Sequence, residues 1–111
     1  MIRGTTPTFH LVLDSDVDLT DTSVYITFSE KNRGIQYTFE SGDENVSITY
    51  SEGHTVIDVS MTQEQTLYIK EASKVNVQVR WVDSEGYAGA TAYASIEVDP
   101  VLLDEVIVYR G

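Results

Sequence analysis

The sequence predicts an all-β domain, and three observations lead to this prediction. Apolar and polar side chains alternate along seven short stretches, which is the period-two pattern of half-buried strands. Residues that favour turns separate most of these stretches. The length of 111 residues suits one domain. Seven short strands joined by turns indicate a two-sheet sandwich of the immunoglobulin-like type, in which each sheet buries one face.

Each of the seven stretches has apolar residues at every second position. In chain order these positions are Phe9, Leu11, Leu13; Val24, Ile26, Phe28; Ile35, Tyr37, Phe39; Val46, Ile48, Tyr50; Ile57, Val59, Met61; Val75, Val77, Val79, Trp81; and Ala90, Ala92, Ala94, Ile96, Val98. Because successive side chains of a strand point to opposite faces, we expect each set to face a common core. Trp81 continues a line of three valines, so it is expected to be the aromatic residue of the core.

The breaks between strands carry turn-forming residues. Four of them contain Gly and two also contain Asn, which are residues that tolerate a positive φ. These four segments are residues 31–34, 41–45, 51–54 and 83–86. We expect a turn in each of them.

One segment departs from the strand pattern. Thr62 lies three residues before Gln65, and this spacing permits a capping box, in which each side chain accepts a hydrogen bond from the backbone N–H of the other residue. We therefore expect one or two helical turns within residues 62–69, connecting the two sheets.

The domain boundary is predicted at residue 100, with a sandwich over residues 1–100 and an apolar tail over residues 101–111. Pro100 lacks a backbone N–H and should end the last strand. Beyond it, six of eleven residues are Val, Leu or Ile, namely Val101, Leu102, Leu103, Val106, Ile107 and Val108. Small monomers rarely leave so large an apolar group in water. The tail is therefore expected to dock on its own domain or on a neighbouring subunit.

Charge and composition exclude several classes of partner. Eighteen acidic and seven basic residues give a net charge of −11, which repels nucleic acids and anionic membranes. The absence of cysteine excludes disulfides, thiolate metal ligands and a cysteine nucleophile. No apolar run approaches the about 20 residues of a membrane span, and the first residues lack the apolar core of a secretory signal. We expect synthesis and folding in the cytoplasm.

The sharpest candidate for a cation site is the acidic run that begins at Asp14. Asp14, Asp16 and Asp18 alternate as the first ligands of a calcium loop do, because hard oxygens bind a hard cation. The pattern then fails, since Leu19 stands where such a loop needs Gly and Tyr25 where it needs Glu. A solvated loop between strands is the simpler interpretation, and we expect no metal or other cofactor.

Catalytic chemistry is not predicted. The two histidines, His10 and His54, are far apart in the sequence, and a triad would need one of them beside a nucleophile and an acid. Two scattered histidines do not form a zinc site. The chain also lacks the glycine-rich motifs that bind phosphate groups. We therefore expect a protein that is not an enzyme.

Two tyrosines are candidate ligand contacts. Tyr25 and Tyr93 fall on the polar side of their predicted strands. Exposed tyrosines anchor protein interfaces or stack on sugars, although tyrosine is also a good strand former. Their position therefore fits either a contact surface or simple strand formation.

The opening segment carries a family resemblance. Residues 2–9 read IRGTTPTF, which resembles small immunoglobulin-like proteins encoded by phages and prophages of gut Firmicutes. Residues 61–66, 75–80 and 101–106 resemble segments of the same proteins, so the resemblance covers the full chain. More loosely, the chain is similar to the N-terminal domain of phage baseplate upper proteins. The resemblance implies a role in a phage tail, baseplate or other part of the virion, without catalytic residues.

Two functional hypotheses follow. The first is a non-enzymatic assembly or interaction module of a phage particle, with other virion proteins or a second copy as the partner. Its predicted interface residues are Arg3, Thr5, Phe9, Leu102, Leu103, Val106 and Ile107. The alternative is a carbohydrate- or cell-surface-binding module, with exposed aromatics in one shallow patch and a calcium ion near the acidic run.

Overall fold

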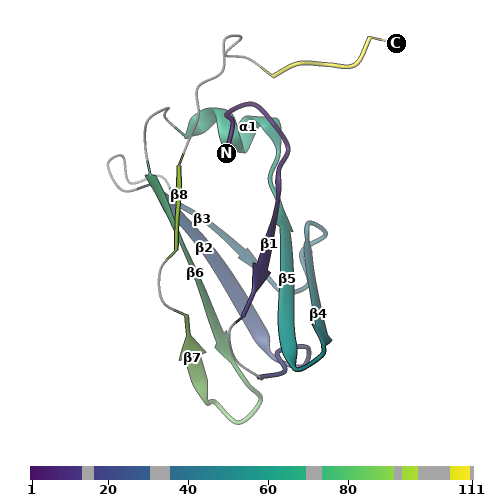
Figure 1. Ribbon diagram of the computed structural model, residues 1–111, viewed down its shortest axis with the longest axis vertical. Helices are drawn as coiled ribbons and strands as arrows, with labels where there is room; N and C mark the ends of the chain where they lie inside the picture. The colour runs from purple at the N-terminus through teal and green to yellow at the C-terminus, as the bar shows by residue number, and fades with distance from the viewer. Residues whose placement is uncertain (14–16, 31–35, 70–73, 92–93, 98–105, 111) are drawn as a thin grey trace.

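The computed structural model is an all-β sandwich with one short helix (Figure 1). It describes residues 1–13, 17–30, 36–69, 74–91, 94–97 and 106–110. Within these ranges the strands are β1 (Thr8–Val12), β2 (Ser23–Glu30), β3 (Gln36–Glu40), β4 (Val46–Ser51), β5 (His54–Ser60), β6 (Lys74–Val82), β7 (Ala88–Ala90) and β8 (Ala94–Glu97). The helix is α1 (Gln63–Tyr68). The predicted fold class, with its immunoglobulin-like sandwich and helical connector, is confirmed.

The strands form two antiparallel sheets. The smaller sheet has the order β1-β5-β4, and the larger has the order β3-β2-β6, with β7 and β8 both paired to β6. The two sheets face each other, and α1 lies at one end of the sandwich, where the chain crosses from β5 to β6 (Figure 1). The helix therefore connects the two sheets, as predicted.

Aromatic rings join the two sheets in the core. The ring of Phe28 on β2 lies 5.1 Å from that of Phe9 on β1 and 5.8 Å from that of Phe39 on β3, measured between centroids. The other buried apolar residues are Leu13, Leu19, Val24, Ile26, Ile57, Val59, Met61, Ile69, Val75, Val77 and Val79. Inward and outward side chains alternate in β2, β5 and β6 as predicted.

Three of the predicted turns lie within the described residues and have the expected backbone. Gly42, Gly53 and Gly86 adopt φ values of 100°, 81° and 88°. In the hairpin of β4 and β5, Glu52 also has a positive φ of 54°, so both loop residues have the sign that a type I′ turn requires. The turn predicted at 31–34 lies outside the described residues.

The last predicted strand is divided, and its first part faces outward. Ala90 of β7 pairs with Arg80, and Ala94 of β8 pairs with Val77. Val77 and Arg80 are three positions apart, whereas Ala90 and Ala94 are four positions apart, so the register changes by one residue. A one-residue change reverses the face of a strand. Ala90 is accordingly exposed, and the prediction that it faces the core is wrong.

Trp81 lies at the margin of the core. It pairs with Val24 on one side and with Gly89 on the other, and its half-buried side chain packs against the buried cluster. The central aromatic residue is Phe28, which corrects the prediction for Trp81. The indole covers Gly89 so closely that a Cβ at position 89 would lie 2.5 Å from the ring.

Replacing Gly89 with alanine should destabilise the domain by about 1–3 kcal/mol, because the new methyl group would force the indole of Trp81 to move. The free energy of unfolding in urea measures this cost. Ala90→Ser, on the exposed side of the same strand, is the control and should change it by less than about 0.5 kcal/mol. In a Trp81→Leu background the Gly89→Ala cost should shrink, and an unchanged cost would contradict the steric explanation.

Candidate functional site

The helix α1 organises one end of the molecule, and its N-terminus has the predicted cap. The Thr62 hydroxyl accepts a hydrogen bond from the backbone N–H of Gln65 (3.1 Å), and the Gln65 side chain accepts one from the N–H of Thr62 (2.9 Å). The predicted capping box is therefore confirmed. Because a six-residue helix is unstable by itself in water, tertiary contacts must also hold it.

The first of these contacts comes from Arg3. Its buried guanidinium donates to the carbonyl oxygens of Leu67 (2.6 Å) and Ile69 at the C-terminal end of α1. The last carbonyls of a helix lack intrahelical partners and carry partial negative charge, so a cation there stabilises the helix end.

The second contact is made by Thr66, which is fully buried on the inner face of α1. Its hydroxyl accepts a hydrogen bond from the N–H of Gly4 (2.9 Å). It also lies at donating distance from the carbonyl oxygens of Thr5 (2.9 Å) and Gln63 (3.1 Å). One hydroxyl thus ties the opening segment of the chain to the helix.

The third contact joins α1 to the larger sheet. The hydroxyl of Tyr37 on β3 donates to the carbonyl oxygen of Gln65 (2.9 Å). Burial raises the pKa of Tyr37 above its ordinary value of 10.0, and negative charge that would develop on Tyr68 and that present on Glu30 and Glu64 raises it further. The hydroxyl therefore stays protonated, and able to donate, through neutral pH.

These placements change the interpretation of the opening segment. Arg3 is buried against α1, and the partly buried Phe9 packs against the core beside Phe28. Both residues therefore make internal contacts, and their interface role stays a prediction. Thr5 is exposed, and its hydroxyl donates to the carbonyl oxygen of Ile2 (2.6 Å). Its interface role stays a prediction.

The C-terminal segment, residues 106–110, lies beyond α1 at the same end of the molecule (yellow in Figure 1). The side-chain amide of Gln63 on α1 donates to the carbonyl oxygen of Ile107 (3.0 Å) and accepts from its N–H (2.8 Å). Val106 also lines a hollow of about 190 Å³ beside Leu67 and Tyr68. Of the predicted tail residues, Leu102 and Leu103 lie outside the described residues.

Exposure increases along the C-terminal segment. The exposed fraction rises from 48% at Val106 through Ile107 and Val108 to 93% at Tyr109. Four successive large side chains with strong strand preference are therefore left in water, with the first of them seated against the helix. Val106 and Ile107 are about half exposed, and their role in docking stays a prediction.

A second candidate surface is the outer face of the larger sheet. Two adjoining hollows of about 350 and 320 Å³ lie there, and Thr27, Gln36 and Arg80 line both. Tyr25, which is 40% exposed, lines the first hollow, so the structure places one of the two predicted ligand contacts at a concave surface. Tyr93 lies outside the described residues.

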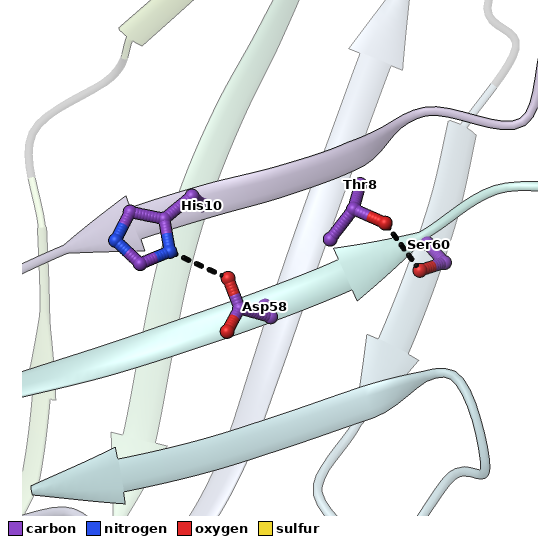
Figure 2. Close-up of polar contacts among 4 residues, drawn as sticks. All are labelled: Thr8, His10, Asp58 and Ser60. Carbon is purple, nitrogen blue, oxygen red and sulfur yellow. Dashed lines mark hydrogen bonds and ion pairs between the residues drawn. The ribbon is translucent and has the colours of Figure 1, made fainter.

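The outer face of the smaller sheet carries polar cross-strand pairs (Figure 2). Nδ1 of His10 on β1 lies 2.7 Å from Oδ1 of Asp58 on β5, and the hydroxyls of Thr8 and Ser60 lie 2.9 Å apart. Each pair joins residues directly opposite in the ladder. The Ser60 hydroxyl bonds Thr8 and not His10, so these residues form two separate pairs and not a triad.

The acidic run contributes a turn. Oδ1 of Asp18 accepts hydrogen bonds from the hydroxyl (2.7 Å) and the N–H (3.0 Å) of Thr20, and these bonds lower the pKa of Asp18 below its ordinary value of 3.8. Asp14 and Asp16 lie outside the described residues. Among the residues that are described, no three His, Asp or Glu side chains gather as a metal site would require.

Comparison with known proteins adds no family assignment. No family model matches the sequence, and no curated protein matches it. Within the described ranges, no helix has both the length and the apolarity needed to cross a membrane.

Thr66→Val should destabilise the domain by about 1–3 kcal/mol, because valine has the same shape but leaves the Gly4 N–H and the Thr5 carbonyl oxygen without their partner. Chemical denaturation measures the change. The control is Thr49→Val on the exposed side of β4, which should alter the free energy of unfolding by less than about 0.5 kcal/mol. Equal effects at the two positions would disprove the role assigned to Thr66.

The pair of His10 and Asp58 should contribute little to stability, because solvent screens exposed charges. A double-mutant cycle with His10→Ala and Asp58→Ala should give a coupling free energy below about 1 kcal/mol at pH 6. A coupling of several kcal/mol would show that the pair has a structural role that its exposure does not suggest.

Proposed function

We propose that this protein is a non-enzymatic assembly module of a phage particle, and that its C-terminal segment docks on the next copy of the same chain. The main support is the exposed run Val106–Tyr109 on a domain whose other large apolar side chains mostly lie in its core. The sequence resemblance to phage proteins supports the virion part of the proposal.

The backbone of the segment suits addition to a sheet edge. In the described part of the segment, the backbone hydrogen bonds are those of Ile107 with the side chain of Gln63. An extended strand with free N–H and C=O groups can pair with an edge strand, while alternate side chains fill pockets on the receiving surface. Anchoring by Gln63 at one end fixes the direction in which the rest of the segment leaves the domain.

The same chain supplies edges that can receive the segment. β1 and β4 are the outer strands of the smaller sheet, and β3 is an outer strand of the larger one. β4 is covered incompletely, because its inward-facing residues Val46 and Ile48 are only half-buried and Tyr50 is 41% exposed. An edge strand with partly exposed apolar residues is a natural acceptor for another strand.

Charge favours a second copy as the partner. The segment ends in the basic residue Arg110, whereas the chain as a whole has a net charge of −11. Opposite charges guide the segment of one copy toward the body of the next, as complementary surfaces do in other complexes. A segment-to-edge contact is heterologous, so repeated copies would form a ring or a filament, which are the arrangements expected in a phage tail.

The test is the oligomeric state of the full chain by size exclusion with light scattering. The wild-type chain should form oligomers, and the double variant Val108→Asp with Tyr109→Asp should be monomeric, because two carboxylates would be buried at the interface. Removing residues 101–111 should have the same effect. The control is Tyr87→Asp, since Tyr87 is 72% exposed in the turn between β6 and β7, and it should leave the oligomer intact.

Two results would contradict the proposal. A wild-type chain that remains monomeric up to millimolar concentration would exclude a second copy as the partner. An oligomer that survives both the double variant and the truncation would show that another surface holds it together.

A further inference from the structure

The hollowed outer face of the larger sheet offers a regular grid of polar side chains. Directly opposed residues of neighbouring strands share a face. Tyr25 on β2 therefore lies beside Arg80 on β6, and Thr27 lies between Thr38 on β3 and Gln78 on β6. The Thr27 and Thr38 hydroxyls are 3.1 Å apart. This ladder fixes the positions of the side chains, so the surface is organised before any ligand arrives.

Small residues of β7 leave one side of this grid open. Ala90 pairs with Arg80 and Ala88 with Val82, so the edge of the sheet beside the guanidinium carries only methyl groups. The register change between β7 and β8 turns these alanines outward. Ala88 lines the larger hollow, and Trp81 also contributes to it. Each hollow reaches the lower end of the size range of ligand pockets, roughly 300–1,000 Å³.

Apart from the cationic Arg80, the described residues of the lining are uncharged and rich in hydrogen-bonding groups. Among the described residues, no carboxylate lines either hollow, although the chain has eighteen acidic residues. The polar residues that contribute are Thr27, Ser29, Gln36, Thr38, Asn76 and Gln78, together with Tyr25 and Arg80. Hydroxyl and amide groups both donate and accept hydrogen bonds, which suits a ligand with many hydroxyl groups.

Arg80 is the distinctive member of this surface. Within the described part of the chain, no hydrogen bond or ion pair involves its guanidinium, even though acidic residues outnumber basic ones by eighteen to seven. It lines both hollows, and a guanidinium carries five N–H donors that could bind a ligand there. Beside it, the partly exposed ring of Tyr25 offers a flat apolar surface on which a sugar ring can stack.

We propose that this face, formed by β2, β3, β6 and β7, binds a neutral oligosaccharide. Sugar hydroxyls would accept hydrogen bonds from Arg80. They would also donate to, or accept from, the side-chain amides of Gln36 and Gln78, and one sugar ring would stack on Tyr25. The net charge of −11 disfavours polyanions such as nucleic acids. The proposal does not depend on docking through the C-terminal segment.

The first experiment is a glycan array of neutral oligosaccharides of two to six units, built from glucose, galactose, mannose, rhamnose and the N-acetylhexosamines, with sialylated and uronic-acid oligosaccharides printed alongside. The wild-type chain should bind at least one neutral oligosaccharide. Absence of binding to all of them would overturn the proposal, and binding to acidic oligosaccharides alone would overturn the neutral assignment.

The second experiment is a calorimetric titration. Adding the oligosaccharide selected on the array to the wild-type chain should give a dissociation constant. This constant should be nearly independent of salt concentration, because a neutral ligand forms no ion pairs.

Matched variants locate the site. Arg80→Ala and Tyr25→Ala should each weaken binding by about 10-fold or more, and Ala88→Leu should weaken it by filling the larger hollow. The control is Tyr50→Ala on the other sheet, because Tyr50 and Tyr25 are equally exposed, at 41% and 40%. Circular dichroism confirms that each variant is folded. Unchanged binding by folded Arg80→Ala and Tyr25→Ala proteins would disprove this location for the site.

Discussion

The buried hydroxyl of Thr66 and the guanidinium of Arg3 hold α1 at one end of the sandwich, and the arrangement there depends on them. Buried polar groups are costly unless they are paired. The opening segment supplies those pairs through the Gly4 N–H, the Thr5 carbonyl oxygen and the side chain of Arg3. Fixing the helix in this way also fixes Gln63, which anchors the C-terminal segment.

The shape of the larger sheet depends on the one-residue change of register between β7 and β8. This change places Gly89 under the indole of Trp81 and turns Ala88 and Ala90 toward solvent. The small outward side chains leave open space beside Arg80, so a concave polar surface forms on a sheet face that would otherwise be nearly flat. The two candidate surfaces therefore have separate physical origins, one in the capping of a helix and the other in strand pairing.

Local signals predicted much of the fold correctly. The three-residue spacing of Thr62 and Gln65 specified the capping box, because both hydrogen bonds lie within one turn. Alternation specified the buried faces of β2, β5 and β6. Leu19 was missed, although it is fully buried, because it lies in an acidic loop without periodicity. It is placed by its N–H bond to the Thr55 hydroxyl, which comes from a distant strand.

The sequence by itself determined the strands, the connector and the acidic, cysteine-free character of the chain, because each of these follows from composition or from neighbours a few residues apart. Tertiary structure alone decided that Arg3 is buried against α1, that Trp81 lies at the margin of the core, and that Tyr25 and Arg80 share one hollow. These properties depend on which strands pair and in which register, and pairing joins residues that are distant in the chain.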